Sequence, residues 1–153
     1  MALKIVILED NAERQAAMQR CLQNRFCQFE AVFFPAAAPM QDYCAVNLDE
    51  TILISLDHDL ELQPGPNGRC LDPGTGRDVA DYLAGRQPTC PVVIHTSNGP
   101  AADGMAMVLQ DAHWQTYRVV PADDLEWIPT TWFRVIRRAI VGKTANGSAK
   151  RVT

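Results

Sequence analysis

The chain has 153 residues, of which 47% are hydrophobic, and it carries a formal net charge of −4. A chain of this length buries roughly two thirds of the surface that its unfolded form exposes, so we expect one domain that folds without disulfides or a structural metal. The acidic balance argues against an extended nucleic-acid groove or a basic membrane-binding stripe, because both require clustered positive charge.

The first third of the chain predicts two strands and two helices. Residues 4–8 form a short apolar run rich in β-branched side chains, which is typical of a strand buried on both faces. Apolar side chains then recur at helical spacing over 12–25, after polar residues that can cap a helix. A second strand is predicted over 29–34, and a short helix near 40–46 follows two prolines.

The middle of the chain continues this alternation. A third buried strand is predicted over 51–56. The segment 63–76 holds seven prolines and glycines, a density that predicts a loop. A helix is expected over 76–85, a fourth buried strand over 91–94, and a helix with proline in its first turn over 100–113.

The last part predicts a fifth strand over 117–120 and a final helix over 131–141. Strands that alternate with helices favour a three-layer α/β fold, because parallel neighbours need crossover connections and these place helices on both faces of the sheet. We expect a single domain over 1–142 and a flexible C-terminal tail over 143–153, whose composition is polar.

Two further features bear on location. No apolar run approaches the roughly 18 residues of a membrane span, and the chain opens on a strand-like pattern in place of a targeting signal. The five cysteines show no close spacing, so neither a disulfide framework nor a zinc site is expected. These features predict a cytoplasmic protein with no membrane partner.

The residues that follow three of the predicted strands are polar, and in an open parallel sheet ligands bind beyond the carboxyl ends of the strands. These residues are Glu9 and Asp10 after the first strand, Asp57, His58 and Asp59 after the third, and His95, Thr96, Ser97 and Asn98 after the fourth. Four carboxylates in one crevice repel each other unless a cation neutralises them. Hard oxygen ligands favour Mg²⁺, Mn²⁺ or Ca²⁺, and of these we expect Mg²⁺ or Mn²⁺.

Simpler structural roles stay open for several of these side chains. Asp10 can cap the helix that follows it, and His95 can be a core histidine that bonds a backbone carbonyl. Ser97 and Asn98 can cap the next helix, although the free amides of a helix N-terminus also bind phosphate. The third histidine, His113, is expected to end a helix and not to bind a ligand.

The order of these motifs resembles a response-regulator receiver domain. The matching runs are KIVILED, ILISLD, PVVIHTS and YRVVP, which lie within residues 4–141. The resemblance implies a flavodoxin-like sheet with the strand order 2-1-3-4-5 and helices on both faces.

The resemblance also implies roles for individual residues. The acidic pair and the phosphoacceptor aspartate that hold Mg²⁺ in receivers map to Glu9, Asp10 and Asp57, with Asp57 as the phosphoacceptor. A Thr or Ser that contacts the phosphoryl group maps to Thr96 or Ser97.

One position departs from the receiver pattern. Receivers carry a lysine just before a proline at the end of the fifth strand, whereas here Val120 precedes Pro121. No lysine occurs between Lys4 and Lys143, so the usual coupling of phosphorylation to a conformational switch is not expected.

The chain has a more specific resemblance to the group of cyclic-phosphate processing receiver domains. Besides the acidic pair, it shows the LDHDL block at 56–60, a Thr-Gly-x-Asp-Val segment at 75–79 and a His-x-Ser-Asn block at 95–98, all in order. This resemblance implies a domain that processes cyclic phosphate or related phosphoester ends of RNA or nucleotides.

The side chains are consistent with a metal-dependent phosphoesterase. Glu9, Asp10 and Asp57 would hold the cation. In the alternation of an extended chain, Asp57 and Asp59 point to one side and His58 to the other, while His95 and Ser97 share a side. We therefore expect His95 to be the general acid or base, with Asp59 as the residue that orients it.

The remaining candidates surround the phosphate. His58 is either a second catalytic residue or a brace against the neighbouring strand. Ser97, Asn98 and the amides that follow are expected to hold the phosphate. Arg77 is the first candidate for the positive charge that the missing lysine does not supply, and Arg14 is the alternative.

Two other functions stay open. The first is a signalling receiver that accepts phosphate on Asp57 without the usual lysine. The second is a non-catalytic pseudo-receiver that contacts a protein partner through the C-terminal helix, where Arg134, Arg137 and Arg138 are expected to face outward.

Overall fold

The computed structural model describes residues 2–149, with side chains described through Gly142. Its centre is a sheet of five parallel strands in the order β2-β1-β3-β6-β7. These strands are β1 (Lys4–Leu8), β2 (Glu30–Phe34), β3 (Thr51–Leu56), β6 (Val92–His95) and β7 (Thr116–Val119). Numbered among themselves, they follow the predicted order 2-1-3-4-5, so the predicted fold is confirmed.

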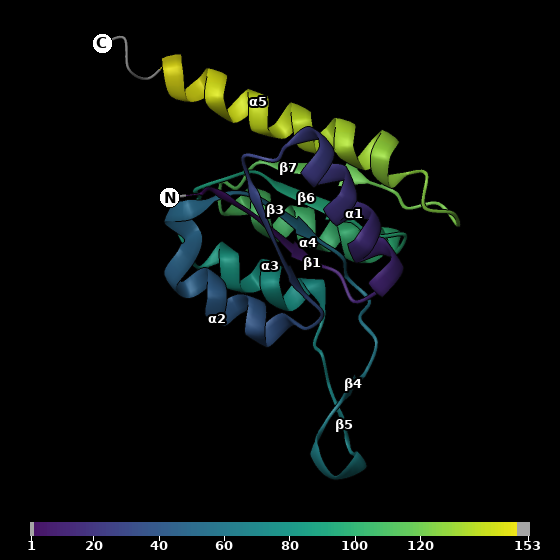
Figure 1. Cartoon of the computed structure of the whole chain (residues 1–153). Helices are drawn as coiled ribbons and strands as arrows, with labels where there is room; N and C mark the ends of the chain where they lie inside the picture. The colour runs from purple at the N-terminus through teal and green to yellow at the C-terminus, as the bar shows by residue number, and fades with distance from the viewer. Residues whose placement is uncertain (1, 150–153) are drawn as a thin grey trace.

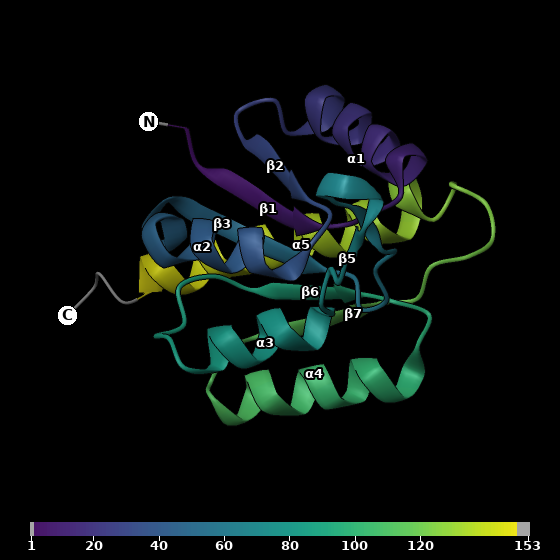
Figure 2. The same cartoon turned by 90° about the horizontal axis from the view of Figure 1, so that it is seen from below.

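Five α-helices cover the two faces of this sheet. They are α1 (Ala12–Arg25), α2 (Ala37–Asn47), α3 (Gly76–Ala84), α4 (Gly99–Asp111) and α5 (Phe133–Ala149). Helices α1 and α5 lie on one face, and α2, α3 and α4 lie on the other (Figure 1). Figure 2 shows α3 and α4 side by side. A single 3₁₀ turn, η1 (Leu48–Glu50), links α2 to β3.

Each face of the sheet has its own hydrophobic core, which explains why the central strands are mostly apolar. On β1, Ile5 and Ile7 pack toward α1 and α5, whereas Val6 and Leu8 pack toward α2, α3 and α4. All four side chains are buried. Strands buried on both faces are expected to read as continuous apolar runs.

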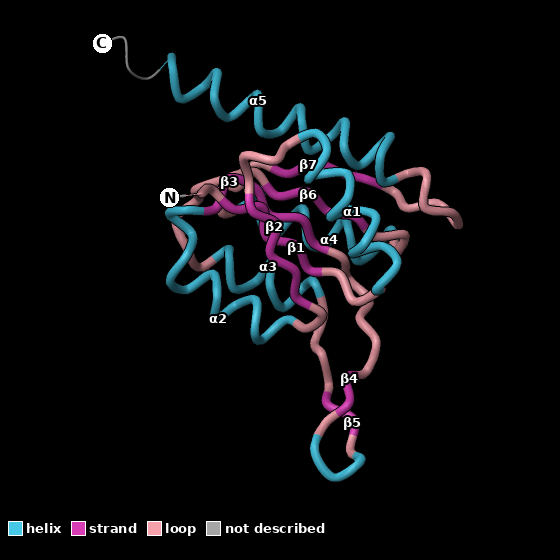
Figure 3. The backbone as a smooth tube through the Cα atoms, in the orientation of Figure 1, coloured by secondary structure: helices cyan, strands magenta, loops and turns pink. Residues whose placement is uncertain are grey.

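The predicted loop over 63–76 contains a small hairpin. Strands β4 (Gln63–Pro64) and β5 (Cys70–Leu71) pair antiparallel, and the 3₁₀ turn η2 (Pro66–Gly68) closes the tip. Asn67 has a φ of 61° in this turn. This hairpin arm projects from the body beyond the carboxyl ends of the strands (Figures 1 and 3).

The last helix begins at Phe133, just after the predicted start at 131, and it ends later than predicted. A π-helical turn, η3 (Ile128–Trp132), precedes α5, and the Trp132 amide donates to the Trp127 carbonyl at 2.8 Å. Helix α5 continues to Ala149, into the segment expected to be a flexible tail. Its interior holds no proline, and its two glycines, Gly142 and Gly147, cost a helix only about 1 kcal/mol each. Residues 150–153 of that tail lie outside the described residues.

No helix in the described part of the chain is both long and apolar enough to span a lipid bilayer.

Candidate functional site

The alternation of the strands places three polar residues together at one edge of the sheet. Every second residue of β1, β3 and β6 packs toward α1 and α5; these residues include Ile7, Leu53 and Val93. Continuing that alternation puts Glu9, Asp57 and His95 on the same side, at the carboxyl ends of the three neighbouring strands. The site is therefore built on the face that α1 and α5 cover.

These three side chains form a buried cluster. One ligand atom from each of Glu9, Asp57 and His95 lies within 4.8 Å of the other two. Glu9 and His95 are fully buried, and Asp57 is 6% exposed. Glu9 Oε1 and His95 Nε2 lie 3.4 Å apart, longer than the usual 2.9–3.0 Å of an N–H···O hydrogen bond, and neither atom has a hydrogen-bond partner.

Two buried polar atoms left without partners are costly to fold, so the pocket is suited to bound groups that satisfy both, with a cation at the Glu9 carboxylate as the simplest case. Carboxylate oxygens suit Mg²⁺ and Mn²⁺. The residues present therefore fit a divalent cation held by Glu9 and Asp57.

Asp10, the third predicted cation ligand, is half-buried beside this cluster. Its Oδ2 accepts a hydrogen bond from the Glu61 amide at 2.6 Å. Burial raises the pKa of the Asp10 carboxyl. The structure thus places His95 in the cluster of three, with Asp10 at its edge.

The pKa values of the two central carboxyls are shifted in opposite directions. Burial raises the pKa of Asp57 to about 6, and the nearby Glu9 charge adds to that rise. Burial also acts to raise the pKa of Glu9, but contact with His95, the Asn11 amide and the Arg14 charge together hold it below the ordinary value. Glu9 is therefore the stronger acid of the two carboxyls.

Arg14 supplies the positive charge of the pocket. Its Nη1 lies 3.6 Å from Glu9 Oε1 and 4.0 Å from Asp57 Oδ2. Its guanidinium lies over the ring of Trp127, 5.3 Å from the centroid, in the range of a cation–π contact. The first candidate, Arg77, instead pairs with Asp81 at 2.8 Å on α3.

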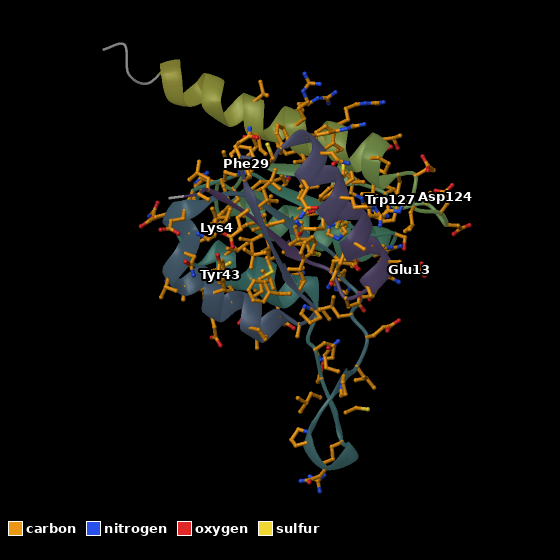
Figure 4. The ribbon with its side chains drawn as sticks, viewed as in Figure 1. Lys4, Glu13, Phe29, Tyr43, Asp124 and Trp127 are labelled. Carbon is orange, nitrogen blue, oxygen red and sulfur yellow. The ribbon has the colours of Figure 1, made fainter. Side chains whose placement is uncertain are left out.

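His95 is held by three residues that the sequence did not single out as site residues. Ser55 Oγ lies 2.7 Å from His95 Nδ1, and Trp132 Nε1 donates to Ser55 Oγ at 3.1 Å. The Trp127 ring stacks on the imidazole at 6.2 Å between centroids, and Figure 4 shows Trp127 between α1 and the start of the C-terminal helix. Ser55 had one signal, a hydroxyl in the middle of a buried apolar strand.

The predicted pairing of Asp59 with His95 was wrong. Asp59 Oδ1 lies 2.9 Å from His58 Nδ1, and Asn98 Nδ2 donates to Asp59 Oδ2 at 3.2 Å. The hydrogen bond with His58 is the main cause that lowers the pKa of Asp59. His58, Asp59 and Asn98 thus form a separate polar group at the exposed rim of the site.

The predicted phosphate-binding residues lie at the start of α4. Asn98 is its N-cap, and its side chain accepts from the Ala101 amide at 3.2 Å. Thr96 is buried, and its hydroxyl accepts from the Asn98 amide at 3.1 Å. Ser97 is exposed. Both interpretations of this segment, helix cap and phosphate seat, are compatible with this geometry.

Gly76, the first residue of α3, packs against the backbone of Asp57. Its amide donates to the His58 carbonyl at 3.0 Å, and a Cβ at this position would overlap the backbone oxygen of Asp57. We expect Gly76→Ala to lower the free energy of unfolding by about 1–3 kcal/mol and to weaken cation binding, because Asp57 must move. Urea unfolding and calorimetric titration with Mn²⁺ measure the two effects.

The matched control is Gly85→Ala, where the added Cβ meets the Tyr82 carbonyl oxygen at an ordinary 3.5 Å. Equal stability and cation affinity in the two variants would show that the contact between α3 and the Asp57 backbone does not shape the site.

Comparison with known proteins identifies the family and the fold. A family model described as the cyclic-phosphate processing receiver domain matches residues 4–111. A search of curated proteins found no match.

Solved receiver structures share the fold at low sequence identity. The phosphorylated cyanobacterial phytochrome response regulator RcpA is 20% identical, with a TM-score of 0.63, and the match covers 86% of this chain and 89% of that one. The receiver domain of an HD domain-containing protein from Pseudomonas fluorescens is 12% identical, with a TM-score of 0.66 and coverage of 95% and 99%. The Mn²⁺-bound form of the response regulator Rcp1 is 16% identical, with a TM-score of 0.60 and coverage of 84% and 88%.

Proposed function

Because the chain belongs to the cyclic-phosphate processing receiver domain family, we propose that it is a metal-dependent phosphoesterase that opens a cyclic phosphate. The observation that carries the proposal is the buried pair formed by Glu9 Oε1 and His95 Nε2, which face each other at 3.4 Å without hydrogen-bond partners. Asp57 adds a second carboxylate within the same 4.8 Å cluster.

The cation site would consist of Glu9 and Asp57, with Asp10 at its edge. A bound Mg²⁺ or Mn²⁺ supplies Lewis-acid polarisation of a phosphoryl oxygen. The Arg14 guanidinium, 3.6 Å from Glu9 and 4.0 Å from Asp57, adds positive charge for the anionic substrate. The N-terminus of α4 and the exposed Ser97 hydroxyl lie at the same edge of the sheet and would hold the remaining phosphate oxygens.

His95 would transfer the proton that ring opening requires. Water adds its oxygen to phosphorus, one P–O ester bond breaks, and the leaving sugar oxygen takes the Nε2 proton of the imidazolium form of His95, which becomes neutral. The proton that the attacking water loses passes to solvent, and His95 regains a proton from solvent before the next turnover, so a cyclic diester and water become a phosphomonoester and a free hydroxyl. Proton transfer of this kind contributes about 10²–10⁴ to a rate.

The substrate class follows from charge. With a net charge of −4, the chain is poorly suited to bind a long RNA, whose affinity depends on many phosphate contacts. We therefore propose a 2′,3′-cyclic nucleotide or the cyclic end of a short RNA as the substrate.

The test is a panel of 2′,3′-cyclic and 3′,5′-cyclic nucleotides incubated with the purified protein and Mg²⁺ or Mn²⁺. We expect a phosphomonoester, followed by ³¹P NMR, that depends on the added cation and disappears with a chelator. No turnover of any cyclic phosphate with either cation would rule out the proposed activity.

Phosphorylation of Asp57 is the second candidate function, and the position of Arg14 favours it. Arg14 puts a cation 4.0 Å from Asp57 Oδ2, in a chain without the usual receiver lysine. Acetyl phosphate with Mg²⁺ should then add one phosphoryl group to the intact mass of the wild type and none to Asp57→Asn. An unchanged wild-type mass across several small phosphodonors would exclude this function.

A further inference from the structure

A chain of buried hydrogen bonds runs from the C-terminal helix to the candidate site. Trp132 Nε1 donates to Ser55 Oγ at 3.1 Å, and Ser55 Oγ lies 2.7 Å from His95 Nδ1. All three side chains are fully buried. The indole N–H can only donate, so Ser55 Oγ is the acceptor of the first bond.

The single proton of the Ser55 hydroxyl decides the direction of the second bond. If His95 Nδ1 carried a proton and donated it, Ser55 Oγ would accept twice and its own buried proton would face no acceptor. A buried donor without a partner is costly. If Ser55 donates to Nδ1 instead, every polar group of Trp132, Ser55 and His95 Nδ1 is satisfied.

The opposite edge of the imidazole leads to the same tautomer. A neutral ring that accepts at Nδ1 carries its proton on Nε2, and Nε2 faces Glu9 Oε1 at 3.4 Å. The Glu9 Oε2 atom accepts a hydrogen bond from the Asn11 amide at 3.1 Å. The Oε1 atom has no hydrogen-bond partner, so it can accept from Nε2. The Trp127 ring, stacked on His95 with an angle of 29° between the planes, opposes a flip of the imidazole.

We propose that Ser55 and Trp132 are positioning residues that keep the single proton of the neutral His95 ring on Nε2, so that His95 offers a hydrogen-bond donor to the pocket and is not a third cation ligand. The value of this arrangement for catalysis rests on the proposed function: the neutral ring donates a hydrogen bond from Nε2 to a phosphoryl oxygen in the pocket, and the imidazolium form, protonated on both nitrogens, gives its Nε2 proton to the leaving oxygen. A histidine that ligates a metal normally donates from its other nitrogen to a neighbouring acceptor. Here the neighbouring hydroxyl donates to the ring, which is the reverse arrangement.

The tautomer can be measured without substrate or cation. The chain has three histidines, so side-chain ¹⁵N spectra of the full chain at pH 8.5 can be assigned by the loss of one ring's signals in His95→Gln. We expect His95 to show a protonated Nε2 and an unprotonated, hydrogen-bonded Nδ1. A protonated Nδ1 in the wild type would overturn the proposal.

Variants of Ser55 test whether its hydroxyl causes the hydrogen-bonded ¹⁵N frequency of His95 Nδ1. Ser55→Ala removes the donor, so the Nδ1 resonance should move to the frequency of an unbonded imidazole nitrogen. Ser55→Thr keeps a hydroxyl in a strand that tolerates β-branched residues, so it should keep the wild-type Nδ1 frequency. An Nδ1 frequency that is the same in Ser55→Ala as in the wild type would overturn the proposal.

Trp132→Phe tests the first bond of the chain. It removes the indole N–H that donates to Ser55 Oγ, so the orientation of the Ser55 hydroxyl is less fixed. The His95 resonances should then broaden or shift, while those of the other two histidines should not change. Unchanged His95 resonances in this variant would remove Trp132 from the proposal.

Cation binding provides an independent test, with Mn²⁺ as the probe. If His95 is not a ligand, His95→Gln should bind Mn²⁺ within about threefold of the wild type, whereas Glu9→Gln should bind at least tenfold more weakly. A tenfold loss in His95→Gln would make His95 a ligand and overturn the inference. If the wild type binds no Mn²⁺, the proposed function fails, and the ¹⁵N spectra still decide the tautomer.

Discussion

His95→Gln is expected to slow the opening of a 2′,3′-cyclic nucleotide by about 10²–10⁴-fold, the usual contribution of a general acid. Glutamine occupies a similar volume and can still accept from Ser55, but it cannot transfer a proton. His95 is fully buried between Ser55 and the Trp127 ring, so water cannot readily take its place. Single-turnover rates with saturating Mn²⁺ would isolate the chemical step from binding.

The other two histidines provide the controls. His113 is exposed at the end of α4 with a φ of 69°, a conformation that asparagine tolerates, so His113→Asn should react at the wild-type rate. His58→Gln breaks the rim pair with Asp59. If His58→Gln lost as much activity as His95→Gln, the proton would come from the rim and not from the buried histidine.

Asp57→Asn is expected to stabilise the cation-free protein above pH 6, by at most about 3 kcal/mol. Burial raises the pKa of Asp57 from 3.8 to about 6, and one pKa unit corresponds to about 1.4 kcal/mol. Between pH 4 and 6 the folded protein holds a proton that the unfolded chain has lost, so this carboxyl makes stability fall as the pH rises through that window. The penalty is complete above pH 6, and it is absent below about pH 4.

Urea unfolding at pH 4.5 and 8.0 in a chelator measures this effect, with the exposed Asp42→Asn as the control. The gain from Asp57→Asn should be clear at pH 8.0 and small at pH 4.5. Adding Mn²⁺ should stabilise the wild type and leave Asp57→Asn nearly unchanged. A variant that is less stable than the wild type at pH 8.0 in the chelator would show that Asp57 is stabilised as an anion.

The sheet and the residues at its edge were predictable because they follow from local pattern. Continuous apolar runs identified the three central strands, and strand alternation placed Asp57 with its neighbours. The same alternation carried His95 to the correct face. Helix α1 also has its predicted bounds, and its N-cap is Asn11, one of the polar residues that precede it.

The surroundings of His95 were not predictable, because they depend on a departure from regular helical geometry. The sequence indicated an α-helix from residue 131, whereas the chain makes a π-helical turn over Ile128–Trp132. In that wider turn Trp127 and Trp132, five residues apart, both reach the His95 region. No periodicity of apolar residues signals such a turn.

The choice between Arg77 and Arg14 also required the structure. Both lie in the first turn of a helix, Arg14 in α1 and Arg77 in α3. Arg77 lies i,i+4 from Asp81 on the same helix, a pairing that the sequence alone permits but does not require. Arg14 lies near Glu9 and Asp57, which follow two neighbouring strands of the sheet.

The hydrogen-bond chain of Trp132, Ser55 and His95 also bears on the order in which parts of the protein fold. Ser55 and His95 are 40 positions apart, and Ser55 and Trp132 are 77 apart. Contacts between distant positions form late, because closing long loops costs entropy before the contacts compensate for it. During synthesis, Trp132 emerges only after all five strands of the sheet. The environment of His95 is therefore a natural reporter of the last step of folding, and its ¹⁵N signature should appear after the sheet has formed.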